Sequence, residues 1–158
     1  MAAPISKRSG EQYAGRSSQR RRVLPDAALL GIQAGAPDEL RRAVERGLEF
    51  HSWESVQAHA GLSTRQMSEV LQMNVKTIGR RKESGRLTAV ESDRLSRLSR
   101  ILAQAIELFE GDEKAAQGWL VAPRDALGGS APLELIRTEV GAREVERMIE
   151  RLEDGVFS

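Results

Sequence analysis

Apolar residues recur at helical spacing through most of the chain, and no segment shows the strict apolar and polar alternation that is typical of a β-strand. The longest such segment predicts a helix over about 91–110. One wide apolar stripe runs along it, formed by Leu95, Leu98, Ile101, Leu102, Ala105, Ile106 and Phe109. A final helix is expected near 139–153, with a buried stripe of Val145, Met148, Ile149 and Leu152. The pattern therefore predicts an all-α fold.

Two short helices separated by a tight turn are predicted over 63–85. Ser63 has the character of an N-cap, and Gln66 follows it in the capping-box position. Asn74 can cap the second helix, in which Ile78 faces inward. This is the layout of a helix-turn-helix, whose second helix lies in the major groove of DNA with its first residues near base edges.

Further helices are expected on both sides of this unit. Upstream, a helix begins at Pro37 and ends at Gly47, which suits a left-handed backbone. Ser52 or a residue beside it can cap the next helix, which closes at Gly61. Downstream, the sequence predicts a helix around 113–120, a loop containing Gly128 and Gly129, and a turn of helix at 132–137.

The candidate DNA contacts lie on or near the exposed side of the second helix of the helix-turn-helix. Long cationic donors suit phosphates and guanine edges, and a hydroxyl can serve either. The residues concerned are Lys76, Thr77, Arg80, Arg81 and Lys82. One departure is Gln72, which occupies the turn position that usually holds glycine. The alternative interpretation is a solvated basic face on a scaffold helix.

Charge is unevenly distributed along the 158 residues. There are 14 Lys and Arg against 9 Asp and Glu up to Gly85, but 10 against 14 from Arg86 onward. This distribution suggests two different partners, because a basic half suits phosphate and an acidic half suits a cationic surface. The alternative is that the uneven charge arises by chance. The arm over 1–24 contains the triplet 20–22 of arginines and is predicted to be disordered in isolation. It either adds sequence-independent phosphate affinity or serves as a solubilising tail.

Several classes of function are not expected from the composition. The chain has no cysteine, which removes disulfides and thiolate nucleophiles and agrees with a reducing cytoplasm. Its two histidines, His51 and His59, lack metal-binding spacing, so neither a metal nor a cofactor is predicted. Acid pairs such as Glu146 and Glu150 lie on a charged helix face, where they stay ionised, so enzymatic activity is not expected.

The sequence also predicts a protein of the cytoplasm. No apolar run approaches the roughly eighteen residues that a membrane span needs. The N-terminus has no apolar core of the kind that a secretion signal requires. Neither a membrane nor an extracellular partner is therefore expected.

The last helix and the residues after it form a second candidate interface. Six acids and three arginines fall within 139–154, a density that often means only solvated surface. The sequence then finishes with Gly155, Val156, Phe157 and Ser158. Such an ending exposes two apolar side chains beside a carboxylate unless something covers them. The pattern favours a partner for this segment.

The segment from Trp119 to Ser158 carries the motifs G-G-S-A-P-L-E-L-I at 128–136 and G-A-R-E-V at 141–145. It resembles the C-terminal toxin-binding domain of the Xre/MbcA/ParS antitoxins, and most of all the Xre partner of RES-domain toxins. The motifs T-I-G-R-R-K at 77–82 and G-R-L-T at 85–88 extend the resemblance to roughly 37–158.

This resemblance implies an inhibitor with two partners. RES toxins resemble ADP-ribosyltransferases and consume NAD, and the antitoxin's C-terminal segment is implied to block their cleft. We expect acidic groups to mimic the pyrophosphate while apolar side chains fill the remaining space. The residues expected to contact the toxin are Arg147, Glu150, Arg151, Asp154, Gly155, Val156, Phe157 and Ser158. The helix-turn-helix is implied to bind the operator of the antitoxin's own operon.

The expected organisation has three parts: the basic arm at 1–24, a helix-turn-helix DNA-binding module at 37–90, and a toxin-binding domain at 91–158. A homodimer is expected, because one short recognition helix seldom supplies enough specificity and dimers read paired half-sites. The alternatives are a stand-alone transcription regulator whose C-terminal domain only dimerises, and a partition-type DNA-binding adaptor.

Overall fold

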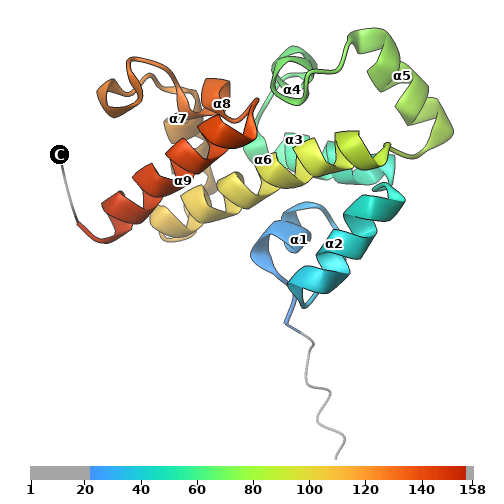
Figure 1. The fold of residues 1–158 in the computed structure, drawn as a ribbon, viewed down its shortest axis with the longest axis horizontal. Helices are drawn as coiled ribbons and strands as arrows, with labels where there is room; N and C mark the ends of the chain where they lie inside the picture. The colour runs from blue at the N-terminus through green and yellow to red at the C-terminus, as the bar shows by residue number, and fades with distance from the viewer. Residues whose placement is uncertain (1–21, 156–158) are drawn as a thin grey trace, which may run out of the picture.

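The computed structural model describes residues 22–155, so most of the basic arm and the last three residues lie outside the described part (Figure 1). The elements are α1 (Pro25–Leu29), α2 (Pro37–Arg46), α3 (Phe50–Ala60), α4 (Thr64–Leu71), α5 (Val75–Ser84), α6 (Ala89–Leu108), α7 (Glu113–Val121), the 3-10 helix η1 (Asp125–Leu127), α8 (Pro132–Leu135) and α9 (Glu139–Glu153). Within residues 22–155 no strand forms, only an isolated bridge between Glu49 and Arg86. The predicted all-α class is confirmed.

The long helix α6 is the centre of the fold (Figure 1). It packs against α1, α2, α3 and α4 on the N-terminal side and against α7 and α9 on the C-terminal side. Leu95, Leu98, Ile101 and Leu102 of the predicted stripe have no exposed surface. A capping box between Thr88 and Glu91 begins the helix, so it starts two residues earlier than the stripe indicated.

The short helix α1 is not predicted by the pattern of apolar residues. It has only five residues, yet Ala27 and Leu30 are fully buried against the rest of the core. Two hydroxyl groups of α3 satisfy carbonyls at its C-terminal end, because Ser52 Oγ donates to O of the C-cap Leu30 and Ser55 Oγ donates to Leu29 O, each at 2.7 Å. Tertiary contacts therefore hold a helix too short to be stable alone.

Two details of the predicted helix ends are wrong. Ser52 does not cap α3, which begins at Phe50 after an extended Glu49; it is buried inside the helix, where its hydroxyl bonds α1 instead. Gly47 has a positive φ of 85° but a ψ of 125°, which is not the left-handed helical region. Glycine is needed there for another reason, since a Cβ would lie 2.3 Å from Leu87 O.

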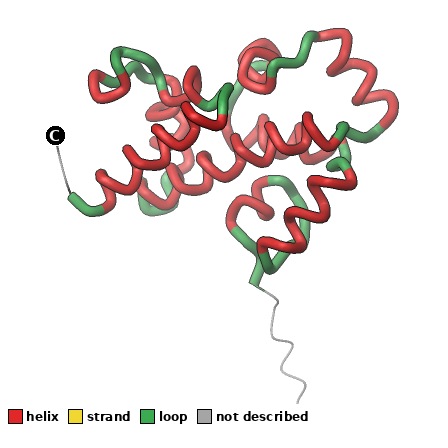
Figure 2. The backbone as a smooth tube through the Cα atoms, in the orientation of Figure 1, coloured by secondary structure: helices red, strands yellow, loops and turns green. Residues whose placement is uncertain are grey.

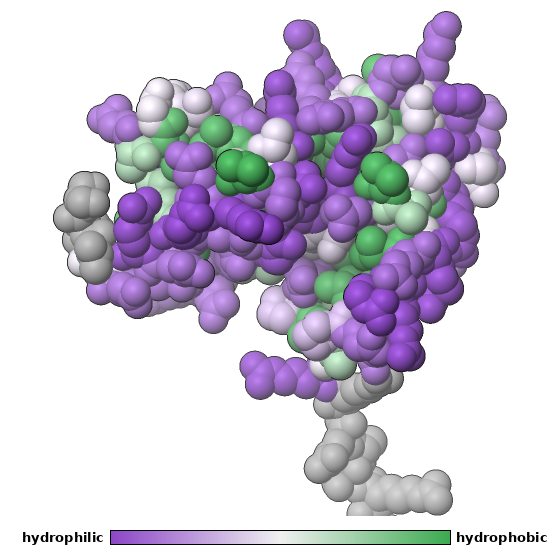
Figure 3. Space-filling view, in the orientation of Figure 1, coloured by the Kyte–Doolittle hydropathy of each residue, from purple (hydrophilic) through white to green (hydrophobic). Residues whose placement is uncertain are grey.

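A single hydrophobic core joins all of these helices, and it runs from Leu29 and Leu30 near the N-terminus to Ile149 in α9. Helices account for most of the described backbone, with short connections between them (Figure 2). The face seen in Figure 3 is mainly hydrophilic, with small separate apolar patches. The two predicted modules are thus parts of one continuously packed body.

Candidate functional site

Helices α4 and α5 form the helix-turn-helix that the sequence predicts. The capping box at the start of α4 is complete, because Gln66 N–H donates to Ser63 Oγ at 3.1 Å and Ser63 N–H donates to Gln66 Oε1 at 2.9 Å. Asn74 caps α5 by accepting from Thr77 N–H at 2.8 Å. Ile78 is buried, which leaves the opposite side of α5 facing outward.

The turn between α4 and α5 accommodates the glutamine that departs from the usual glycine. Gln72 takes the left-handed conformation, with φ 51° and ψ 45°. This backbone costs a residue with a side chain more than it costs glycine. Gln72 gains a compensating contact, because its Nε2 donates to Arg137 O in the α8–α9 connection at 3.2 Å. The turn therefore has the expected geometry, and it is tied to the C-terminal module.

Four of the five predicted DNA contacts share the accessible surface of α5. Lys76, Arg80 and Lys82 are exposed, and Thr77 is partly exposed. Arg80 Nη2 donates to Thr77 Oγ1 at 3.3 Å, so these two side chains lie together. Long cations at the start and middle of an accessible helix are what phosphate and base-edge contacts require. Their role toward DNA stays a prediction.

Arg81 lies differently from its neighbours. Its Nε donates to both carboxylate oxygens of Glu91, at 3.0 and 2.8 Å, and the hydrogen bonds raise its pKa further. Burial opposes ionisation of Glu91, but bonds from Arg81 and from the Thr88 backbone outweigh it, so the pKa of Glu91 lies below its usual value. The pair fastens α5 to the start of α6. A DNA contact by Arg81 remains a prediction.

The predicted toxin contacts on α9 lie on one face. Arg147, Glu150 and Arg151 are exposed at spacings of three and four residues, and Asp154 follows one turn later as the C-cap. Among residues 22–155 these four side chains form no ion pair. Gly155 ends the helix with a φ of 70°. The remaining predicted contacts, Val156, Phe157 and Ser158, lie outside the described residues.

The inner side of α9 is fixed to α6 by two arginines. Arg97 Nε donates to Glu139 Oε2 at 3.0 Å, and Arg100 Nε donates to Glu146 Oε1 at 2.6 Å. Arg97 also donates to Arg137 O at 3.4 Å. The Arg97 side chain is only 13% exposed but Glu139 is 46% exposed, so this pair lies at the surface, whereas the Arg100–Glu146 bond is partly buried. The outer face of α9 is therefore presented on a rigid support.

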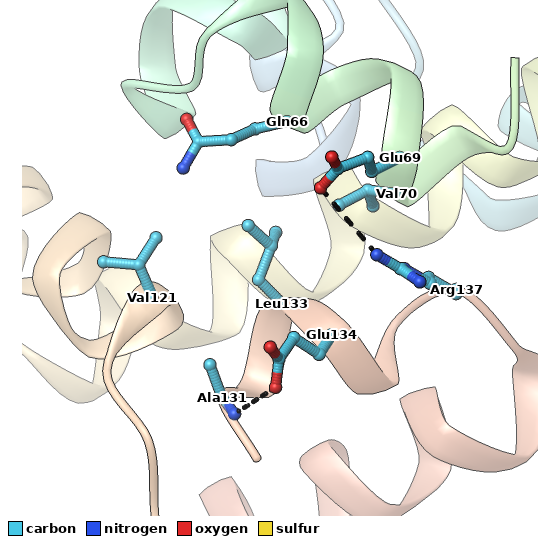
Figure 4. Close-up of a pocket in the computed structure, with 8 residues that line it drawn as sticks. All are labelled: Gln66, Glu69, Val70, Val121, Ala131, Leu133, Glu134 and Arg137. Atoms are coloured by element: carbon cyan, nitrogen blue, oxygen red, sulfur yellow. Dashed lines mark hydrogen bonds and ion pairs between the residues drawn. The ribbon is translucent and has the colours of Figure 1, made fainter. Parts of the chain in front are cut away.

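A small cavity lies where the helix-turn-helix meets the C-terminal module (Figure 4). Its volume is about 170 Å³. The lining residues are Gln66, Glu69, Val70, Val121, Ala131, Leu133, Glu134 and Arg137. Arg137 Nη2 reaches across from the C-terminal module to Glu69 Oε2 of α4 at 3.8 Å. Local sequence does not predict this junction, because the residues of α4 that line it lie more than 50 positions from those of the C-terminal module.

Within residues 22–155 no group of three His, Cys, Asp or Glu side chains could hold a metal ion. His59 Nδ1 lies 2.8 Å from Glu113 Oε1, and His51 Nδ1 lies 3.1 Å from Glu49 Oε2. Each histidine thus has a single carboxylate partner rather than a ligand set. Over the same residues, no helix is both long and apolar enough to cross a membrane.

The two modules match two family models. The model described as the Antitoxin Xre-like helix-turn-helix domain matches residues 39–100. The model described as the Antitoxin Xre/MbcA/ParS C-terminal toxin-binding domain matches residues 104–155. An Antitoxin Xre of Yersinia enterocolitica is 32% identical over 130 residues, which cover 82% of this chain and 88% of that protein. The chain belongs to the Xre antitoxins.

Other relatives of this Xre antitoxin carry the same name. The Antitoxin Xre of Photorhabdus laumondii is 28% identical over 130 residues, 82% of this chain and 88% of that protein. The Antitoxin Xre of Pseudomonas putida is 36% identical over 69 residues, which are 44% of this chain and 43% of that protein. Antitoxins inhibit and do not catalyse, so family membership confirms that the chain is not an enzyme.

The family matches also bear on the predicted organisation. The helix-turn-helix match ends at residue 100 and the toxin-binding match begins at residue 104, both inside α6. The boundary between the predicted modules lies earlier, between residues 90 and 91, in the first turn of that helix. Because α6 packs against both modules, it belongs structurally to both. The helix-turn-helix and the toxin-binding domain are therefore two surfaces of one Xre antitoxin.

Proposed function

We propose that this Xre antitoxin neutralises a cognate NAD-consuming RES-domain toxin by placing its C-terminal segment in the toxin's active-site cleft. The observation that carries the proposal is the match to the toxin-binding domain over 104–155, which ends directly before Val156, Phe157 and Ser158. A dinucleotide cleft has cationic groups for the pyrophosphate and apolar walls for the bases. The C-terminal segment has acidic groups that suit the cationic site and apolar side chains that suit the apolar walls.

The geometry of α9 supports this mode of inhibition. Glu150 and Asp154 lie on the same exposed face and precede Gly155, so they bring carboxylates to the point where the chain leaves the helix. Those carboxylates approach the cationic pocket while Val156 and Phe157 occupy apolar space. Arg147 and Arg151 on the same face pair with acids at the rim of the toxin. Occupation alone excludes the substrate.

A truncation tests the inhibitory segment. Removal of residues 155–158 is expected to leave the helical CD spectrum and DNA binding unchanged while toxicity returns when the cognate toxin is co-expressed. A Glu150→Lys and Asp154→Lys double variant should also weaken neutralisation, whereas Glu54→Lys, which is exposed on α3, should not. Full neutralisation by the truncated chain would refute inhibition by this segment. Co-purification with mass measurement gives the stoichiometry.

We further propose that a homodimer binds the operator of its own operon through α5. The support is the accessible cationic surface of Lys76, Arg80 and Lys82 on a helix-turn-helix with complete caps. Fluorescence anisotropy on duplexes from the operon's promoter measures this binding, and the affinity is expected to fall steeply with salt. Binding without neutralisation of any RES toxin would instead favour a stand-alone regulator.

A further inference from the structure

Among the described residues, Val75 is an apolar side chain that packs against no part of the core, at the start of the helix expected to read DNA. It is the first residue of α5, directly after the Asn74 cap, and 67% of its surface is exposed. Asn74 supplies the N-cap by accepting from Thr77 N–H, so Val75 has no part in capping the helix. Within residues 22–155, nothing in the core explains a β-branched apolar residue at this position.

Gly79 lies one turn further along the same helix, at i+4 from Val75, and so on the same side of α5. A glycine inside a helix lowers its stability relative to alanine. At Gly141, by contrast, a close neighbour explains the glycine, because a Cβ there would lie 2.0 Å from Leu135 O. At Gly79 no heavy atom of residues 22–155, apart from its chain neighbours and the backbone of α5 itself, lies within 4 Å of the Cβ position, and φ is not positive. Nothing in the described fold requires a glycine there.

Val75 and Gly79 together form a low apolar strip bordered by cations. Lys76 and Arg80 lie on one side of the strip and Lys82 on the other, all exposed. The floor of the major groove presents thymine methyl groups between two rows of phosphates. The small apolar residues of the strip suit the thymine methyl groups on the groove floor, and the cations on both sides suit the two rows of phosphates.

We propose that the Val75–Gly79 strip of α5 faces the floor of the major groove, where Val75 contacts the C5 methyl group of a thymine and Gly79 allows the helix close approach. This inference rests on the proposed operator binding and adds the base that α5 reads. Val75 is then a specificity-determining residue, whereas Lys76, Arg80 and Lys82 supply contacts to phosphates or guanine edges.

The test uses duplexes selected by the full chain from a random-sequence library. In the best selected duplex, each thymine is replaced singly by uracil, which differs only in lacking the C5 methyl group. Loss of one buried methyl group is expected to weaken wild-type binding about three- to fivefold at one position of each half-site. Val75→Ala should bind the thymine duplex more weakly by a similar factor and should no longer distinguish thymine from uracil there.

Gly79 gives a second, independent readout. Gly79→Ala is expected to raise the urea midpoint of unfolding, because alanine stabilises a helix, while the affinity for the selected duplex falls at least fivefold. Gly118→Ala is the matched control, since Gly118 is an exposed glycine inside α7 that also has no heavy atom within 4 Å of its Cβ position. It should raise the midpoint and leave DNA affinity unchanged.

The outcomes separate this inference from the proposal on which it rests. If the selected duplex binds specifically but no uracil position changes the affinity, Val75 does not read a thymine, and operator binding stands. If Gly79→Ala binds DNA as tightly as wild type, the close approach is wrong. If the selection enriches no sequence and the full chain binds no duplex, operator binding and this inference both fail.

Discussion

The missing side chain of Gly141 determines how closely α9 can approach the end of α8. Gly141 is buried in the first turn of α9, and a Cβ there would lie 2.0 Å from Leu135 O and 2.8 Å from Leu135 C. The colliding atoms belong to the backbone, so no rotation of a side chain relieves the contact. Thr138 closes the same turn by accepting from Gly141 N–H at 3.0 Å.

Gly141→Ala is therefore expected to destabilise the protein by about 3 kcal/mol, because α9 must shift away from its support. Urea unfolding followed by far-UV CD measures the change. Gly118→Ala should instead stabilise the protein, by about 0.5–1 kcal/mol. A Gly141→Ala protein as stable as wild type would contradict the close packing of α9 against Leu135.

The Arg81–Glu91 pair gives a prediction that depends on pH. Glu91→Gln removes a buried carboxylate from the Arg81 guanidinium and is expected to cost about 2 kcal/mol at pH 7. The folded-state pKa of Glu91 is lowered, so its contribution is present above the unfolded value near 4.5 and is lost as pH falls through the folded value. The difference between wild type and variant should shrink on acidification.

Glu83→Gln is the control for this effect, since Glu83 is exposed on α5 and forms no ion pair among the described residues. Its cost should stay within about 0.5 kcal/mol at every pH. Equilibrium unfolding at pH 7 and between pH 3 and pH 5 distinguishes the two variants. A Glu91→Gln penalty that grows toward low pH would show that the sign of the pKa shift is wrong.

At the scale of the helices, the sequence predicts a helix correctly where the interactions that determine its ends are local. Helices α4, α5 and α9 were predicted almost to the residue, because Ser63, Asn74 and the apolar spacing of 139–153 act within one or two turns. The helix α1 was missed because hydroxyls from α3 and α6 and the core hold it, and such contacts leave no periodic signal.

The residues of the candidate site also fall into those whose placement follows from local spacing and those whose placement depends on distant partners. Exposure of Lys76 and Arg80 followed from the inward position of Ile78, which lies on the opposite side of α5. The ion pair of Arg81 could not be predicted in this way, since its partner Glu91 belongs to the next helix. The contact between Gln72 and Arg137 joins positions 65 residues apart, and only the folded chain brings them together. Long-range pairing of this kind is set by packing rather than by local sequence.

The helix α1 carries the prediction that belongs to this scale. Leu30→Ala is expected to cost about 3 kcal/mol, because the side chain is fully buried and the surrounding helices cannot close the space completely. Val140→Ala, at a side chain that is 76% exposed, should change stability by less than about 0.5 kcal/mol. Equal effects of the two changes in urea unfolding would mean that α1 does not dock as described.

At the scale of the whole molecule, the continuous core predicts one cooperative unfolding transition. Each module holds one buried tryptophan, Trp53 in α3 and Trp119 in α7. Trp53→Phe leaves a tryptophan only in the C-terminal module, and Trp119→Phe leaves a tryptophan only in the N-terminal module. In both variants the fluorescence midpoint should coincide with the far-UV CD midpoint in urea. Separated midpoints would show that the modules unfold independently.

Sharing α6 between two modules also restricts how such proteins can diversify. A crossover between two relatives near residues 100–104 would join half-helices whose buried residues were selected against different neighbours. In such a hybrid protein, the buried residues of α6 would pack poorly on both sides of the crossover point. Substitutions on the outer faces of α5 and α9 avoid this shared helix, so the two proposed surfaces can change without disturbing the core that α6 joins.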